Sequence, residues 1–240
     1  MNLKVIEVTH YTDKLFKIKL ERPPTYRFVA GEFTMIGLDN WSKKLQKNKP
    51  IMRAYSFTSG PYDEFLEFYS IKVEDGPLTS RLKDIKVDDE LIVGEKPTGT
   101  LTLNNLELGG NLHLVATGTG IAPFISLLRD PTTYDHFDSI SVYWTVPLVQ
   151  DLRSYNTFLE EQDITYFPTV TREEFKNQGR ITKYIDAGIW DDITPTTDKV
   201  MICGSMDFNL EMKQRLEDKG YTEGNNRSAG SYTLERAFVG

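Results

Sequence analysis

The 240-residue chain carries 28 lysine and arginine residues against 35 aspartate and glutamate residues, a formal net charge of -7. This acidic balance argues against general nucleic-acid binding, because phosphate recognition relies on a basic surface. No run of about 18 apolar residues is present, so no membrane span is expected. The length allows one large domain or two ordinary ones.

A single cysteine, Cys203, excludes an internal disulfide and any self-contained cysteine-ligated iron–sulfur or zinc site. The first five residues enter a strand-like alternation directly, without a charged and then apolar leader. We therefore expect a cytoplasmic protein.

The N-terminal part, residues 1–105, contains short stretches in which apolar and polar residues alternate, as they do along half-buried strands. Glycine, proline and asparagine or aspartate separate these stretches, and Pro23-Pro24 cannot continue a central strand. The predicted strands cover residues 3–8, 15–20, 33–38, 51–59, 65–73 and 89–93, with one short helix at 78–83. Six such strands predict a small antiparallel β-barrel.

The C-terminal part, residues 106–240, alternates apolar strands with helix-compatible runs after a Gly-rich boundary at 106–111. The predicted strands cover residues 112–116, 139–145, 164–168 and 199–203, and the predicted helices 121–129, 151–161, 180–187 and 207–219. This alternation predicts an α/β domain, with a parallel sheet covered by helices on both faces.

The stretch 51–59 places Arg53, Tyr55 and Ser56 on one short strand. Side chains alternate along a strand, so Arg53 and Tyr55 share one face. A guanidinium matches a pyrophosphate, and a tyrosine ring can lie flat on a heteroaromatic ring. Taken alone, the pattern equally describes an edge strand with a surface arginine and a half-buried tyrosine.

Two glycine-containing turns are candidate anion sites. Gly76-Pro77 leads into a short helix whose free N–H groups favour anions, and the Thr79 and Ser80 hydroxyls can add to them. The loop 117–120, Thr-Gly-Thr-Gly, lies between a buried strand and a helix, where backbone can approach a pyrophosphate closely. Each turn also has a purely structural explanation, as an N-capped surface helix and as a tight strand-to-helix turn.

Further candidates follow predicted strands of the C-terminal part. Arg172 and Arg180 come after such a strand, where loops form the ligand crevice of parallel sheets, although solvated arginines are the commoner finding. Cys203 precedes Gly204, and a lone cysteine in this setting is most often a small buried apolar side chain.

Taken together and in order, these motifs resemble the bacterial-type ferredoxin/flavodoxin–NADP(+) reductases, a branch of the plant-type ferredoxin reductase superfamily. The resemblance covers nearly the whole chain and includes Arg-x-Tyr-Ser at 53–56, Gly-Pro-Leu-Thr-Ser at 76–80, Thr-Gly-Thr-Gly at 117–120, Cys203-Gly204 and the ending Leu-Glu-Arg-Ala-Phe-Val-Gly at 234–240. It implies FAD and NADP(H) as cofactors and ferredoxin or flavodoxin as electron-transfer partner, in a protein expected to be a monomer.

The resemblance also implies roles for single residues on the flavin side. Arg53 would hold the flavin phosphates, Tyr55 would stack on the ring system, Ser56 would face its reactive nitrogen, and Phe238 would stack on the adenine. The remaining implied flavin contacts are Ala54, Ile71, Lys72, Val73, Gly76, Leu78, Thr79 and Ser80.

On the nicotinamide side, the loop Thr117, Gly118, Thr119 and Gly120 would bind the pyrophosphate, and Arg172 and Arg180 the 2′-phosphate. Cys203 would lie beside the reacting nicotinamide carbon, and Ala237 would leave room for that ring. Glu235 matches a family carboxylate near the site, for proton relay or for positioning. The implied catalytic residues are thus Ser56, Tyr55, Cys203, Glu235 and Ala237.

One segment departs from the family pattern, since residues 144–147 read Trp-Thr-Val-Pro where relatives carry His-Gly-x-Arg. The departure leaves NADPH preference open, with Arg153 as a possible replacement. It also keeps an NADH-dependent flavin reductase or an oxygenase reductase component as an alternative. A non-catalytic redox-sensing module is a second alternative, which Cys203 and the small Ala237 argue against.

A lysine-rich loop precedes the Arg53 strand, with Lys43, Lys44, Lys47 and Lys49. A solvated loop is the default reading of such a cluster. A basic patch near the flavin edge of an acidic protein would also steer an acidic electron carrier into place.

Overall fold

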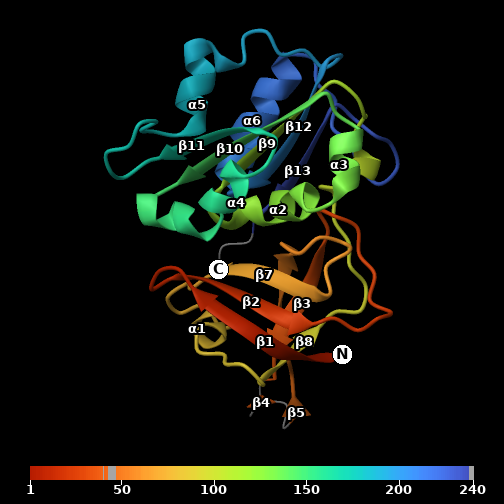
Figure 1. Ribbon diagram of the computed structural model, residues 1–240, viewed down its shortest axis with the longest axis vertical. Helices are drawn as coiled ribbons and strands as arrows, with labels where there is room; N and C mark the ends of the chain where they lie inside the picture. The colour runs from red at the N-terminus through yellow and green to blue at the C-terminus, as the bar shows by residue number, and fades with distance from the viewer. Residues whose placement is uncertain (40, 43–46, 238–240) are drawn as a thin grey trace.

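The computed structural model (Figure 1) describes residues 1–39, 41, 42 and 47–237. Two sheets dominate it, an antiparallel one built from the N-terminal half and a parallel one built from the C-terminal half. Both parts of the predicted fold class are therefore confirmed at the level of the sheets.

The N-terminal sheet has six strands in the order β6-β3-β8-β1-β2-β7, all paired antiparallel. Its strands are β1 (Asn2–His10), β2 (Leu15–Glu21), β3 (Phe33–Leu38), β6 (Ile51–Ser56), β7 (Phe65–Ile71) and β8 (Glu90–Val93). An isolated antiparallel bridge between Phe57 and Phe68 joins the chain just after β6 to β7, the two strands at opposite ends of this order. The short pair β4 (Trp41–Ser42) and β5 (Lys47–Asn48) was not predicted.

The alternation seen in the sequence produces the core of this sheet. Along β2, Phe16, Ile18 and Leu20 are almost fully buried while the lysines between them are only half-buried. They pack with Phe57 and with Leu78, which precedes the helix α1 (Thr79–Leu82). The turn after β7 is thereby fixed to the same core.

The C-terminal sheet is parallel throughout, with the order β11-β10-β9-β12-β13. Its strands are β9 (Asn111–Thr117), β10 (Ser139–Val146), β11 (Thr165–Val170), β12 (Asp198–Gly204) and β13 (Tyr232–Arg236). Every residue of β12 is buried, as expected of a strand covered on both faces. The four strands predicted within 112–203 are confirmed, and the fifth, β13, is the C-terminal stretch that enters the site.

Helices cover both faces of the parallel sheet. Figure 1 shows α2 (Ala122–Leu128) on the side toward the N-terminal sheet and α6 (Met206–Asp218) on the other side. Leu114 of β9 packs in the cluster that contains α2, and the next residue, Val115, packs in the cluster that contains α6. The remaining helices are α3 (Pro131–Asp135), α4 (Asn156–Glu160), α5 (Ile181–Tyr184), the 3-10 helices η1 (Leu103–Asn105), η2 (Gly118–Ile121) and η3 (Val149–Ser154), and the π-helix η4 (Ile185–Ile189).

Two predicted helices differ from the observed ones. The single helix expected at 151–161 is interrupted at Tyr155, whose φ of -139° and ψ of 2° are not helical. The helix expected at 180–187 passes from α5 into η4, where Gly188 has a φ of 99°. The short α3 was not predicted; Asp130 caps it by accepting a hydrogen bond from the Thr132 N–H at 3.0 Å.

The two sheets share one packed interface rather than a loose linker. Leu15 and Tyr69 of the N-terminal sheet belong to the same buried cluster as Phe124 and Leu128 of α2. The Ser126 hydroxyl, also on α2, donates a hydrogen bond to the carbonyl oxygen of Ser59 at 2.7 Å. This interface holds α2 against β7.

Candidate functional site

A narrow slot of about 50 Å³ lies where β6 and β7 meet the carboxyl ends of the parallel strands. This edge is where parallel sheets bind ligands. The slot brings together Tyr55, Cys203 and Ala237, which lie far apart in the sequence. The other predicted site residues that line it are Ala54, Ser56, Ile71, Val73, Thr79, Thr119, Gly120 and Glu235.

A second cavity of about 860 Å³ adjoins the slot, and its size is typical of small-molecule sites. The predicted dinucleotide residues that line it are Thr117, Gly118, Thr119, Arg172 and Arg180. The two cavities have Tyr69, Ile71, Thr119 and Ala237 in common, so they form one continuous cleft.

Tyr55 presents its ring to the slot in a fixed orientation. Its hydroxyl shares a hydrogen bond of 3.0 Å with the Ser70 hydroxyl, and its ring packs edge-on against Phe68 at 6.5 Å between centroids. Burial raises the pKa of the Tyr55 hydroxyl, so the side chain stays neutral. The neighbouring Ser56 hydroxyl lines the slot and makes no hydrogen bond to any residue in the described part of the chain, which leaves it available to a ligand.

The structure does not bring every predicted flavin residue into the cleft. Arg53 is exposed, donates a hydrogen bond to its neighbour's carbonyl, Met52 O, at 2.8 Å, and lines neither cavity. The other predicted residues outside both linings are Lys72, Gly76, Leu78 and Ser80, and Phe238 lies outside the described residues.

These outlying residues form the turn that leads to the slot. A Cβ at Gly76 would lie 2.4 Å from the Thr79 hydroxyl oxygen, so only glycine allows this close approach. The Thr79 hydroxyl in turn accepts a hydrogen bond from the Val73 N–H at 3.1 Å. The Leu78 side chain is buried in the N-terminal core, so only the backbone of this residue can face a ligand.

The glycines of the loop 117–120 have different tasks. Gly118 has a φ of 54°, and a Cβ there would meet open space. A Cβ on Gly120 would lie 2.2 Å from the carbonyl oxygen of Cys203, so this glycine lets the loop pack directly on β12. Trp144 holds the loop from the other side, because its ring N–H donates to the Gly118 carbonyl at 2.8 Å.

Cys203 and Glu235 lie in register on the neighbouring strands β12 and β13. Burial, and then the nearby carboxylate of Glu235, raise the pKa of the Cys203 thiol, so it is no thiolate nucleophile. Burial also raises the pKa of Glu235 to about 7. Its Oε2 accepts a hydrogen bond from the Thr100 N–H at 3.1 Å, which orients the carboxyl group.

Sequence reasoning missed the residues that hold Glu235 and the loop. Thr100 contacts Glu235 across 135 positions of sequence, and no local pattern indicates that contact. Asn209, which lies on α6, donates a hydrogen bond from its side-chain amide to the Glu235 carbonyl oxygen at 2.8 Å. Trp144 could have been found, because it stands near the carboxyl end of a predicted parallel strand.

Two further sequence-based suggestions can be located. Arg153 is exposed and lines neither cavity, while Pro147 lines the larger cavity. Of the lysine-rich loop, Lys43 and Lys44 lie outside the described residues, and Lys49 is exposed.

The site fits a flat ring system beside a phosphate-bearing ligand. The slot offers the Tyr55 face and the unbonded Ser56 hydroxyl, and the larger cavity offers the open backbone at Gly118. Arg172 and Arg180 form no ion pair within the described residues, and they line a cavity that also carries the carboxylates of Asp13, Asp151, Asp207 and Glu211. No group of three or more potential metal-ligating side chains, and no helix long and apolar enough to cross a membrane, occurs among the described residues.

Comparison with known proteins gives the family. Residues 114–214 match the model of the oxidoreductase NAD-binding domain. Ferredoxin–NADP reductase A of Sorangium cellulosum is 43% identical over 98% of this chain and 89% of its own length. Flavodoxin/ferredoxin–NADP reductase of Rhodobacter capsulatus is 44% identical over 98% of this chain and 92% of its own.

Among solved structures, a ferredoxin NADP+ reductase from Neisseria gonorrhoeae with bound FAD and NADP superimposes with a TM-score of 0.90 at 29% identity. The match covers 99% of this chain and 98% of that one. The chain therefore belongs to the ferredoxin/flavodoxin–NADP reductase family.

Proposed function

We propose that this protein transfers electrons between NADP(H) and ferredoxin or flavodoxin by way of FAD. The observation that carries the proposal is the convergence of Tyr55, Cys203 and Ala237 on one slot between the two sheets. FAD supplies the chemistry, since it can exchange an electron pair with a nicotinamide and single electrons with a protein carrier. The protein's share is binding, alignment and exclusion of water.

Residues 1–105 form the flavin domain in this proposal. Tyr55 offers the flat face on which the ring system packs, and the Ser56 hydroxyl supplies a hydrogen bond at the ring's reactive edge. The turn 73–80 presents backbone N–H groups and the Ser80 hydroxyl to the flavin phosphates. Arg53, which is exposed and bonded only to a backbone carbonyl, can turn toward them. Phe238 completes the predicted set.

Residues 106–240 form the nicotinamide dinucleotide domain. The loop 117–120 takes the pyrophosphate against its backbone, and Arg172 and Arg180 take the 2′-phosphate through charge-assisted hydrogen bonds. Ala237 is small enough to admit the nicotinamide ring to the slot, and Cys203 forms part of the wall that limits its approach.

Glu235 is proposed to hold a proton at the slot. Its pKa of about 7 means that both protonation states are populated near neutral pH. The Thr100 N–H donates to its Oε2 at 3.1 Å, while the Thr100 hydroxyl donates to the neighbouring Leu234 carbonyl at 2.9 Å. A carboxyl group in this state can pass a proton to solvent or hold a neighbouring group in place.

An NADH-dependent flavin reductase or oxygenase reductase component is the second candidate. Pro147 supports it, because this apolar residue lines the larger cavity at the position where the family pattern carries an arginine. Arg172 and Arg180 favour NADPH.

Anaerobic mixing of the FAD-loaded protein with each reduced nicotinamide separates these candidates. We expect NADPH to bleach the flavin absorbance faster than NADH. Equal rates, or faster reduction by NADH, would support the second candidate, and a yellow protein bleached by neither nicotinamide would contradict both. Ser56→Ala should keep FAD but slow the reduction, and an unchanged single-turnover rate would remove Ser56 from the mechanism.

Three further properties belong to the proposal. A cytoplasmic location agrees with the single, reduced Cys203. The proposal takes the protein to be a monomer. The lysines at 43–49 would guide an acidic carrier to the flavin edge, and carrier reduction insensitive to salt and to Lys49→Glu would count against that role.

A further inference from the structure

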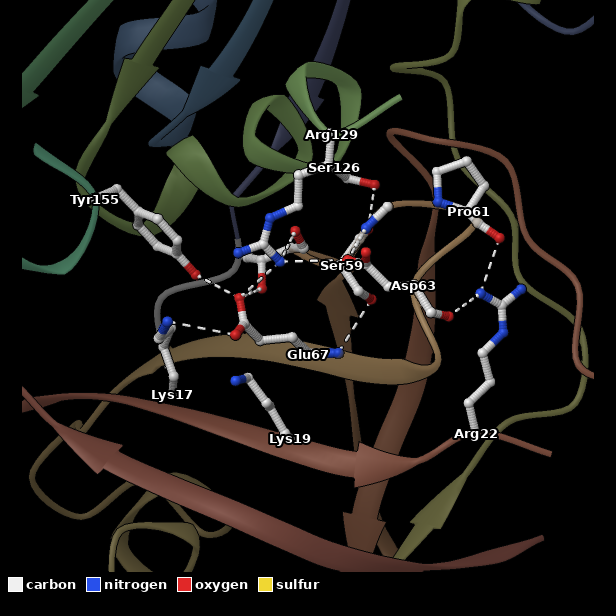
Figure 2. Close-up of polar contacts among 12 residues, drawn as sticks. Lys17, Lys19, Arg22, Ser59, Pro61, Asp63, Glu67, Ser126, Arg129 and Tyr155 are labelled. Carbon is white, nitrogen blue, oxygen red and sulfur yellow. Dashed lines mark hydrogen bonds and ion pairs between the residues drawn. The ribbon is translucent and has the colours of Figure 1, made fainter. Parts of the chain in front are cut away.

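We propose that Glu67 is a positioning residue whose buried charge sets how α2 and β7 meet at the slot. This inference rests on the proposed function. Glu67 lies on β7, its side chain is fully buried, and it contacts groups from both halves of the chain (Figure 2). It lines neither cavity, so it acts through other residues and not on a ligand.

Four side chains meet the carboxylate of Glu67. From the C-terminal half, Arg129 Nη1 lies 3.2 Å from Oε1, and the Tyr155 hydroxyl donates to the same oxygen at 3.3 Å. From the N-terminal half, the Thr58 hydroxyl donates to Oε1 at 2.8 Å, and Lys17 Nζ lies 3.3 Å from Oε2. Figure 2 shows Arg129, Tyr155 and Lys17 around Glu67, between the end of α2 and β7.

The carboxylate is held in its charged form. Burial opposes ionisation, but the charges of Arg129 and then Lys17 outweigh it and keep the pKa of Glu67 below its usual value. The buried carboxylate is strongly coupled to its partners, because it would be left uncompensated without Arg129 and Lys17. Arg129 has a second acidic partner, Asp63, whose Oδ2 lies 3.6 Å from its Nη1. Glu67 therefore works as an anchor between the two halves.

Glu67 and Arg129 meet at one end of the pair formed by β7 and α2. The opposite end of this pair lines the slot. Toward the slot, β7 contributes Ser70 and Ile71, while the approach to α2 contributes Thr119 and Gly120. At the far end Arg129, the residue directly after α2, bonds Glu67 and also donates to the Thr58 carbonyl at 3.0 Å. The spacing of α2 from β7, and hence the width of the slot, is thus fixed where Glu67 meets Arg129.

Glu67→Gln is the sharpest variant, because it keeps the size of the side chain and an oxygen for Thr58 but removes the charge that holds Arg129 and Lys17. Relaxation of β7 away from α2 would shift the flavin side of the slot relative to the nicotinamide ring. The phosphate-binding loop would stay packed on β12 and bonded to Trp144, and Arg172 would be unaffected. Misplacement by about 1 Å can cost on the order of a hundredfold in rate. The matched control is Glu64→Gln, which changes an exposed glutamate three residues earlier.

The test compares two affinities with one rate. Calorimetry gives the affinity of the FAD-loaded protein for NADP+ and for 2′-phospho-ADP-ribose, which lacks the nicotinamide ring, and stopped flow gives flavin reduction at saturating NADPH. For Glu67→Gln we expect fragment affinity within about twofold of the parent, an NADP+-to-fragment ratio changed about fivefold or more, and reduction slowed about tenfold or more. Glu64→Gln should match the parent in all three.

Arg129→Lys keeps the positive charge but changes the geometry of the contact with Glu67, and it is the variant to use if Glu67→Gln does not fold. We expect it to change the affinity ratio and the reduction rate in the same direction, by smaller factors. A variant that loses thermal stability but keeps the parent's affinity ratio and reduction rate would overturn the proposal and leave Glu67 a purely structural residue. Failure of the proposed function would show separately, as a parent protein that NADPH does not reduce.

Discussion

Cys203 and Glu235 pair in register across β12 and β13, and both line the slot that Ala237 also lines. Only 2% of the Cys203 surface is exposed, and burial raises the pKa of Glu235 to about 7. Glu235 therefore carries only part of its negative charge near neutral pH. This shift makes the protonation of Glu235 measurable through the pH dependence of stability.

The first prediction concerns Glu235→Gln. The folded-state pKa of Glu235, about 7, lies above its usual value of 4.5, so its contribution to stability is full below pH 4.5 and is lost as the pH rises through 7. Relative to the Gln variant, the parent should lose up to about 3 kcal/mol across this window. Urea unfolding of both proteins from pH 4.5 to 8 measures this difference, and parallel stability curves would contradict it.

The second prediction compares two glycines of one loop. Gly120→Ala drives a Cβ to within 2.2 Å of the Cys203 carbonyl oxygen, so the loop must leave β12. We expect a loss of about 1–3 kcal/mol in stability and at least about tenfold weaker NADP+ binding. Gly118→Ala meets open space in the protein and should cost about 1–2 kcal/mol in stability from its positive φ. Because Gly118 lines the larger cavity, its methyl group should also weaken NADP+ binding by blocking the approach of the pyrophosphate.

Thermal unfolding and calorimetric titration of both glycine variants give the comparison. If Gly120→Ala folds and binds NADP+ as tightly as the parent, then the close packing of the loop on β12 is not what shapes the phosphate site.

Sequence patterns predicted the two sheets because a strand buried on one face alternates apolar and polar residues, whereas a strand buried on both faces is apolar throughout. Alternation marked β2, and continuous apolar residues marked β9 and β12. The break at Tyr155 was not predictable, because it depends on a tertiary contact: the Tyr155 hydroxyl reaches Glu67 on the other sheet. A local pattern cannot report such a partner.

The same distinction applies to the site. The motif resemblance predicted that Tyr55, Cys203 and Ala237 would meet. Cys203 and Ala237 share the edge formed by the carboxyl ends of parallel strands, whereas Tyr55 comes from β6 of the antiparallel sheet. Thr100 and Asn209 escaped notice because they act on Glu235 across the fold, through one backbone N–H and one backbone carbonyl. Sequence motifs therefore reveal residues that face a ligand more readily than residues that orient those ligand-facing side chains.

The third prediction concerns coenzyme preference. Arg172→Ala and Arg180→Ala each remove a cation from the larger cavity. A hydrogen bond to a charged group contributes about 1.5–3 kcal/mol, so KM for NADPH should rise about tenfold or more while KM for NADH stays within about twofold. Arg153→Ala is the matched control, because Arg153 lies outside both cavities and should change neither KM.

Steady-state reduction of an artificial acceptor with each coenzyme gives these constants. An equal rise in KM for NADPH and NADH would show that the two arginines bind the shared pyrophosphate instead of the 2′-phosphate.

The last prediction concerns Asp198, at the opposite end of the parallel sheet from the cleft. Its Oδ1 lies 3.0 Å from His113 Nε2, and its Oδ2 accepts hydrogen bonds from Thr197 and from the Thr194 N–H. Burial opposes ionisation, but these bonds, that of His113 first, lower the pKa of Asp198 to about 2. Because the folded-state pKa lies below the usual value of 3.8, the ionised carboxylate stabilises the protein at any pH above 3.8. This stabilisation is lost as the pH falls from 3.8 toward 2.

Asp198→Asn should therefore destabilise the protein by about 2 kcal/mol at pH 7, and the deficit should shrink as the pH falls below 4. Denaturant unfolding at pH 7, 4 and 3 measures the deficit, and one that stays constant with pH would assign the effect to lost packing instead of lost charge. Because the cleft lies at the other edge of the sheet, flavin reduction by NADPH should be unchanged in the folded variant. A slowed reduction would mean that the two edges of the sheet are coupled.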